Sequence, residues 1–406
     1  MNYDEVKCMW NLTKQAKEKF SKCNILPIPE TDEEWEITLR EANEDGDDLI
    51  SHLEEELEET KEELLQILPS RFIPYVENGS LNLPTLPKFV REDYLQWIHE
   101  ASKEFERILD AAHSQTEKAV TYLSNAVQDV FEESLHDSTI DRIEREGNSL
   151  HLYINTDGGF ASKALIHLIF ENVLSEVSDE PIEVGQWIVY YELQRTIEGF
   201  AFRVLFECPD VEWTITMKNL DAEFYYRPAL YTLLNNEDKL EETSFGDYVA
   251  QLNPAHRFWL NTPHVTCPIQ SFSETILLDN GKLEFTNNEM VVTVGNERFT
   301  YDLGEINPIQ FIYTDVNEDP YAHLSEPMAV EEIETAALGS DLEQQVRAFN
   351  TMYANPHELV DVINRVMAKM EITEENEMLA SVYANYFFEN GILVEEVIEK
   401  YRSLIN

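Results

Sequence analysis

The stretch LHDSTIDRIEREGNSLHLYIN, residues 135–155, decides the fold class of this chain. Polar and apolar residues alternate on both sides of Gly147-Asn148, and two short alternating runs around a tight turn predict a β-hairpin. Further short segments rich in Ile, Val, Tyr and Phe follow as far as Met217. Their spacing predicts an antiparallel meander or sandwich and lacks the βαβ pattern of a nucleotide-binding sheet.

Helical patterns flank this β region on both sides. Thr31 and Glu34 form a capping-box candidate that opens a leucine-patterned run to about Leu68, and a second helical region covers residues 91–133. Two turn signatures after residue 275 predict two more hairpins, and from Val330 the pattern is helical to the end. We therefore predict an α+β protein with an acidic helical domain over 1–133, an antiparallel β domain over 134–226, a mixed region with β-hairpins over 227–329 and a C-terminal helical domain over 330–406.

Acidic residues dominate the composition. The chain has 79 Asp and Glu against 29 Lys and Arg, a formal net charge of −50. Residues 30–63 alone hold 17 acids and two bases. Such a surface repels nucleic acid and anionic membranes and attracts basic proteins. We expect a basic protein partner, no direct contact with nucleic acid and no membrane contact, while the sequence leaves the oligomeric state open.

One acidic segment is the candidate binding surface. Its carboxylates could stand in for phosphates and engage the Lys and Arg side chains of a partner. The alternative is a solvated helix whose charge serves solubility only. The candidate partner-binding residues are Asp47, Asp48, Glu55, Glu58, Glu59 and Glu62.

No catalytic motif is complete. His136-Asp137-Ser138 holds the residue types of a hydrolytic triad, but neighbours on a strand point to opposite faces. A polar strand entry, with Asp137 or Ser138 bonding local backbone, is the better interpretation. Phosphate-binding loops and zinc-ligand spacings are absent from the sequence. We expect no catalytic residues, no metal and no cofactor, although the enzyme question stays open.

The cysteines and the amino terminus indicate a cytoplasmic protein. No apolar run is long enough for a signal peptide or a membrane span. The cysteines lie far apart and form no CxxC pair, so isolated reduced thiols are expected. They are Cys8, Cys23, Cys208 and Cys267.

Three segments carry a family resemblance. Leu135–Leu152, the apolar strand around 166–173 and the run Trp187–Glu192 resemble an uncharacterised family of Gram-positive bacterial proteins with a domain of unknown function, over roughly residues 1–225. The HDS opening at residues 136–138 is also similar to that of immunity proteins encoded beside polymorphic toxins. The resemblance supplies no catalytic residues.

Charge and resemblance together favour one function. The leading hypothesis is a non-enzymatic cytoplasmic binding protein, such as an immunity or inhibitor factor that neutralises a basic partner, for example a nuclease toxin. The alternatives are a metal-dependent hydrolase that uses Asp and Glu ligands and an acidic scaffold with no charge-specific partner.

Overall fold

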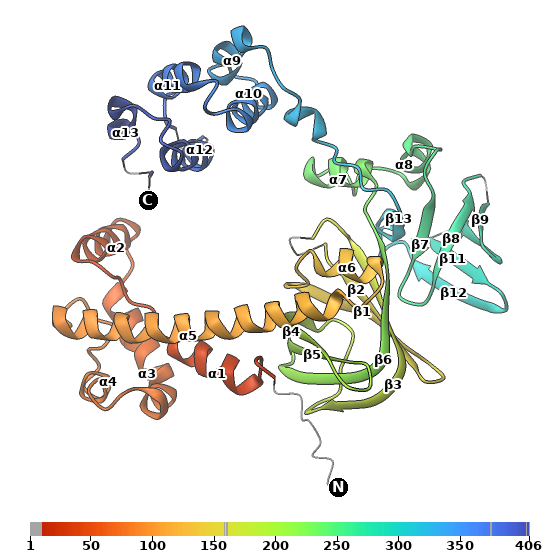
Figure 1. Ribbon diagram of the computed structural model, residues 1–406, viewed down its shortest axis with the longest axis horizontal. Coiled ribbons are helices and arrows are strands. Elements are labelled where there is room, and N and C mark those ends of the chain that lie inside the picture. The colour runs from red at the N-terminus through yellow and green to blue at the C-terminus, as the bar shows by residue number, and fades with distance from the viewer. Residues whose placement is uncertain are drawn as a thin grey trace. The chain divides into compact units, whose positions relative to one another are not determined.

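The chain forms two compact units (Figure 1). The computed structural model describes residues 10–157, 159, 161–273, 275–286, 288–373, 376–402 and 404–405, and Cys8 lies outside them. The first unit takes in the chain up to Arg227 with His256–Asp302 and Phe311–Asp315; the second holds Pro228–Ala255, Leu303–Gln310 and Val316–Asn406. The division into four sequence domains stays a prediction.

Six helices open the first unit. They are α1 (Lys14–Cys23), α2 (Asp32–Asp45), α3 (Leu49–Ile67), α4 (Ile73–Glu77), α5 (Lys88–Val120) and α6 (Asn125–Phe131). The predicted capping box is confirmed, because the Glu34 N–H donates to Thr31 Oγ1 at 3.1 Å and the Thr31 N–H donates to Glu34 Oε2 at 3.3 Å. Gly46, with φ at +80°, ends α2, so the acidic run forms two helices rather than one.

A closed antiparallel barrel follows the helices. Its strands are β1 (Ser138–Glu146), β2 (Ser149–Asn155), β3 (Leu165–Ser178), β4 (Trp187–Arg195), β5 (Phe200–Glu207) and β6 (Val211–Tyr225). The order around the barrel is β1-β2-β3-β6-β5-β4. The predicted hairpin is confirmed as β1 and β2, with the turn at Gly147. The sheet closes where β1 pairs with β4 at Ser138 and Thr139, so it is neither an open meander nor a two-layer sandwich.

Side chains fill the barrel. Along β2, Leu150, Leu152 and Ile154 are buried in the same core cluster as Phe202 of β5 and Trp213 of β6. The short helix α6 adds Val127 and Val130 to this core. Because strand residues alternate between faces, the intervening side chains lie on the outside of the barrel. The described interior is therefore a packed core, and the surfaces that can bind lie outside it.

The second sheet of the first unit has seven strands. They are β7 (Phe258–Asn261), β8 (Thr266–Ser271), β9 (Ile276–Leu278), β10 (Gly281–Thr286), β11 (Glu289–Val294), β12 (Glu297–Asp302) and β13 (Ile312–Thr314). Their order is β12-β11-β10-β9-β8-β7-β13. The two predicted hairpins are confirmed as β9–β10, with Asn280 at φ +54°, and β11–β12.

The second unit is helical. Its helices are α7 (Ala229–Asn236), α8 (Phe245–Gln251), α9 (Val330–Ala337), α10 (Leu342–Ala354), α11 (Val360–Lys369), α12 (Glu377–Glu389) and α13 (Glu395–Lys400), with a short 3₁₀ turn at Ala322–Ser325. Another 3₁₀ turn, Pro308–Phe311, begins in the second unit and ends at the first residue of a segment of the first unit. Helices α9 to α13 share a core that includes Phe349, Ile363, Phe387 and Tyr401. The predicted α+β class, with helices before and after a central antiparallel region, is confirmed.

No described helix combines the length and the apolar character needed to cross a lipid bilayer.

Candidate functional site

Four of the six predicted binding residues lie on one face of α3. Glu55, Glu58, Glu59 and Glu62 are exposed and recur at spacings of three and four residues, which places them within one stripe of the helix. Leu57 and Leu64, both buried, lie on the opposite side of α3. We call these four glutamates the acidic stripe. Because the side of α3 with the two leucines packs into the core, the acidic stripe faces solvent.

The acidic stripe has few counter-ions. Lys61 Nζ lies 2.7 Å from Glu58 Oε2, three residues away on the same helix. Among the described residues no cationic side chain lies within ion-pair distance of Glu55, Glu59 or Glu62. These carboxylates are held close together by the helix and keep most of their charge available to a partner.

The other two predicted residues lie at the start of α3. Asp48 is its N-cap: the Ser51 N–H donates to Asp48 Oδ1 at 3.3 Å and Ser51 Oγ donates to Oδ2 at 2.9 Å. Hydrogen bonds from the Ser51 side chain and backbone hold the pKa of Asp48 below its usual value. Asp47 is exposed in the turn between α2 and α3. Asp48 thus has a structural role, and neither residue belongs to the acidic stripe.

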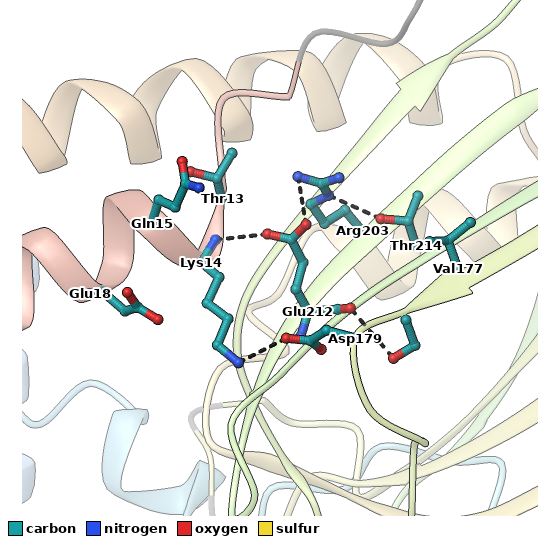
Figure 2. A pocket seen from close by; sticks show the side chains of 10 residues that line it. Thr13, Lys14, Gln15, Glu18, Val177, Asp179, Arg203, Glu212 and Thr214 are labelled. Atoms are coloured by element: carbon teal, nitrogen blue, oxygen red, sulfur yellow. Dashed lines mark hydrogen bonds and ion pairs between the residues drawn. The ribbon is translucent and has the colours of Figure 1, made fainter.

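A pocket of about 750 Å³ lies where the start of α1 meets the barrel (Figure 2). Lys14 Nζ lies 2.8 Å from Asp179 Oδ2 and 3.1 Å from Asp210 Oδ2, and Lys17 Nζ lies 2.9 Å from Asp210 Oδ1. Burial alone would raise the pKa of Asp179, but hydrogen bonds from Lys14 and from the Glu212 N–H lower it below its usual value. The two lysines likewise lower the pKa of Asp210 against the effect of burial.

Further acids bind the chain that leads into α1. The fully buried Glu192 accepts hydrogen bonds from the Asn11 N–H, the Leu12 N–H and Asn11 Nδ2, all at 2.8–2.9 Å. Glu212 accepts from the Lys14 N–H at 2.8 Å and pairs with Arg203 at 3.3 Å. We call this set of paired acids the α1 clasp: Asp179, Glu192, Asp210 and Glu212.

The pocket shows the composition of a structural contact. Its cations, Lys14 and Arg203, both pair with acids of the α1 clasp, as Figure 2 shows for Arg203 and Glu212. The described lining residues include no cysteine or histidine, and Ser178 donates to the Glu180 carbonyl. The other lining hydroxyls also have partners, because Thr13 Oγ1 accepts from the Ala16 N–H at 3.1 Å and Thr214 Oγ1 accepts from Arg203 Nε at 3.0 Å.

The HDS segment closes the barrel. Ser138 Oγ donates to the Leu135 carbonyl, and the Asp137 N–H donates to the Ile188 carbonyl at 3.0 Å. His136 Nδ1 lies 2.5 Å from the Val189 carbonyl oxygen. The Ser138 and His136 side chains therefore bond to backbone at the β1–β4 seam, as the polar strand-entry interpretation predicts for Ser138. Asp137 Oδ1 lies 3.5 Å from His136 Nε2, but Ser138 Oγ bonds to the Leu135 carbonyl and does not complete a triad with this pair.

A row of side chains crosses the outer face of the barrel. Arg142, Tyr153, His167 and Glu223 are successive cross-strand partners on β1, β2, β3 and β6. The Arg142 guanidinium lies 3.7 Å from the centre of the Tyr153 ring, which stacks on His167 at 4.1 Å. His167 Nδ1 lies 3.2 Å from Glu223 Oε2, and its Nε2 lies 2.9 Å from His151 Nδ1.

The outer-face row joins the two sheets of the first unit. Arg142 donates to the Thr262 carbonyl at 2.9 Å and to Thr266 Oγ1 at 2.6 Å, next to β7 and β8. His151 and His167 lie within hydrogen-bond distance of each other, and their rings stack with centroids 5.1 Å apart. No Ser, Thr or Cys in the described part of the chain hydrogen-bonds to either imidazole. The row is thus a brace between the two sheets of the first unit.

Sequence reasoning singled out the residues of the acidic stripe, whose role as a binding surface stays a prediction, and missed the α1 clasp and the outer-face row. The signal was present in part, since Glu192 and Arg203 are charged residues inside otherwise apolar strands. Their partners lie about 180–190 residues away in the chain, at Asn11 and Leu12. No local pattern encodes such a pairing.

Comparison with known proteins gives one match. The model of a family described as a protein of unknown function, DUF4085, matches residues 13–217. This range begins at the N-cap of α1 and covers the α1 clasp, the acidic stripe and most of the barrel. Searches of curated proteins and of solved structures find no match. Since the matched range is half of the sequence, the chain belongs to the DUF4085 family of proteins of unknown function.

Proposed function

We propose that this protein is a non-enzymatic cytoplasmic binding protein whose acidic stripe captures a basic protein. The observation that carries the proposal is the contrast on α3: Glu55, Glu59 and Glu62 are exposed and unpaired within the described residues, while the opposite side of the helix is anchored by Leu57 and Leu64. A rigidly held row of carboxylates presents a fixed pattern to Lys and Arg side chains. Such a pattern speeds encounter and selects against acidic partners.

The kind of partner follows from the same chemistry. Nucleases and other nucleic-acid-binding proteins carry basic surfaces that match phosphates, and carboxylates can occupy those surfaces. An inhibitor of this type is also what the resemblance of the HDS segment to immunity proteins of polymorphic toxins suggests, a resemblance that rests on the sequence alone. The hydroxyls of Thr13, Ser178 and Thr214, which line the pocket of the α1 clasp, are held in hydrogen bonds within the protein, as in a structural contact.

Two other functions have less support. For a metal-dependent hydrolase, the described residues contain no group of three or more His, Cys, Asp or Glu side chains placed to hold a metal ion. For a scaffold without a charge-specific partner, the acids would be expected to spread evenly along the chain, whereas residues 30–63 alone hold 17 of the 79 acids and two of the 29 bases.

The test compares two variants with the same change in charge. One neutralises the acidic stripe, with Glu55, Glu58, Glu59 and Glu62 each replaced by Gln. The control neutralises four exposed acids of α5: E100Q, E106Q, D110N and E117Q. Basic proteins captured at low salt by the wild type are identified, and their association rates are measured by surface plasmon resonance between ~20 and ~300 mM salt.

We expect the stripe variant to lower the association rate at low salt by about tenfold and the α5 control to change it far less. The wild-type rate should fall steeply as salt increases. Equal losses in both variants would show that net charge alone acts and would support the scaffold. A failure to capture any basic protein at low salt would remove the proposal.

A further inference from the structure

Helix α12 of the second unit has apolar residues on both sides. Ala380, Tyr383, Ala384 and Phe387 pack into the core of α9 to α13. On the outer side Met378 and Val382 are 81% and 58% exposed, and Tyr386 is half-buried. These exposed apolar side chains lie in one stripe beside the polar Glu377, Ser381 and Asn385, and a contiguous exposed apolar stripe marks a candidate interaction site.

Helix α10 extends this apolar face. The Phe349 ring lies 4.9 Å from Tyr383, and the Tyr353 ring stacks on Tyr386 at 3.9 Å. Residue numbers increase together in the two contacts, so α10 and α12 run in the same direction side by side. Tyr353 is 46% exposed at the end of α10, and Leu342 is 68% exposed at its start.

We call these apolar side chains the α10–α12 face. Met378, Val382 and Tyr386 recur every four residues, and Leu342, Val346 and Tyr353 follow helical spacing on α10. The stretch from Met378 to Tyr386 spans about 12 Å of helix at 1.5 Å per residue. This length and pattern fit two to three turns of an amphipathic helix that lies along α10 and α12.

The charge around the face selects its occupant. Residues 330–406 contain 15 Asp and Glu and five Lys and Arg. Glu343 on α10 and Glu389 on α12 are exposed beside the apolar residues. A second copy of this chain would bring the same negative charge against it, which costs binding energy. A partner helix with basic flanks would instead place its cations next to these carboxylates.

We propose that the α10–α12 face binds an amphipathic helix of a partner protein, with an apolar stripe on Met378, Val382 and Tyr386 and with basic flanks near Glu343 and Glu389. The stacked pair Tyr353 and Tyr386 would be its aromatic anchor, since tyrosines are enriched at the centres of interfaces. This surface lies on the second unit, goes beyond the proposed function and does not depend on the acidic stripe.

The test uses the full chain and two synthetic peptides. One is an 18-residue helix with leucines on one side and lysines on the other, and the second replaces each lysine by glutamate. Binding is measured by fluorescence anisotropy of the labelled peptides at ~150 mM salt. The test variant is M378S/V382S, and the matched control is V330S/V394S, since Val330 and Val394 are both 51% exposed elsewhere in the second unit.

We expect the Leu–Lys peptide to bind with a dissociation constant on the order of micromolar and the Leu–Glu peptide at least tenfold more weakly. M378S/V382S should weaken the first interaction by about tenfold or more, because two apolar side chains lose their buried contact. The control should bind like the wild type. Circular dichroism checks that both variants keep their helices.

Three outcomes would overturn the inference. The first is equal binding of the two peptides, and the second is binding that M378S/V382S leaves unchanged. The third is a dimer of the wild type, detected by analytical ultracentrifugation, that M378S/V382S dissociates, because the occupant would then be a second copy. The variant with a neutralised acidic stripe separates the two proposals: if it alone abolishes peptide binding, the peptide sits on α3 and only this inference fails.

Discussion

The acidic stripe and the α1 clasp use the same residue types in opposite ways. In the α1 clasp, Glu192 accepts three hydrogen bonds from Asn11 and Leu12, and Asp210 pairs with both Lys14 and Lys17. In the acidic stripe, most carboxylates have no cation within reach among the described residues. Acids that hold the fold are paired, and the unpaired acids of the acidic stripe lie on the side of α3 opposite its buried leucines.

This comparison shows what the charge of −50 does to stability. A buried carboxylate is tolerated only where hydrogen bonds replace its water, as at Glu192. An exposed carboxylate keeps its water and contributes little to the folding free energy. Substitutions in the α1 clasp should therefore change the free energy of unfolding more than substitutions in the acidic stripe. Effects of equal size in the two regions would contradict the comparison.

The largest effect is expected on the anchored side of α3. Leu64 is fully buried among Leu57, Phe72 and Tyr94. Leu64→Ala should lower the free energy of unfolding by about 3 kcal/mol, because it removes buried apolar surface and leaves a cavity. Glu62→Ala, two residues away on the acidic stripe, should change it by less than about 0.5 kcal/mol. Urea denaturation followed by circular dichroism measures both.

The next effect is expected at Glu192. Glu192→Ala leaves the Asn11 and Leu12 N–H groups without their acceptor, which should cost about 2 kcal/mol. Glu192→Gln keeps one carbonyl oxygen and should recover part of this loss. Glu198→Ala, at an exposed position after the same strand, is the control and should be neutral. Equal stability of the alanine variant and the wild type would show that the α1 clasp does not hold α1.

A smaller effect is expected from pH at Asp179 and Asp210. Their pKa values are lowered in the folded protein, so their contribution to stability is complete above the unfolded value of 3.8 and is lost as pH falls through the folded values. Both side chains are about 40% exposed, so water screens the gain to below about 1 kcal/mol. D179N and D210N should each lower stability at pH 7 and approach the wild type near pH 2. A difference that grows on acidification would contradict this sign.

Local patterns predicted the elements well. The capping box at Thr31, the β1–β2 hairpin and the two hairpins after residue 275 depend on neighbouring residues, and each is found where the sequence indicated. The acidic stripe is also local, since it follows from helical spacing alone. The helix break at Gly46 was missed because the leucine pattern on α3 was extended backwards across a glycine.

Long-range pairing was beyond reach of these patterns. The barrel closes because β3 pairs with β6 and β1 pairs with β4, and no turn chemistry encodes either pairing. The α1 clasp and the outer-face row depend on those pairings. His167 becomes the neighbour of Glu223 only in the register that joins β3 to β6, and a shift of one residue would place the two side chains on opposite faces of the sheet. The pattern of a single sequence predicts which residues share one face of a helix or strand. Only the tertiary pairing decides which of these faces come into contact.

The smallest effect is expected on the acidic stripe itself, and its sign sharpens the comparison. Glu55 and Glu59 are four residues apart on the same helix face, so their like charges destabilise α3 by a few tenths of a kcal/mol. Glu59→Gln should therefore raise stability slightly at ~20 mM salt, and the gain should vanish near ~500 mM salt because the repulsion is screened. Glu58→Gln should show less gain, since it also removes the pair with Lys61. Thermal unfolding at both salt concentrations measures the two shifts. If Glu59→Gln instead lowered stability, the Glu59 carboxylate would contribute to the folding free energy. The distinction between paired acids that stabilise the fold and unpaired acids that do not would then be wrong for the acidic stripe.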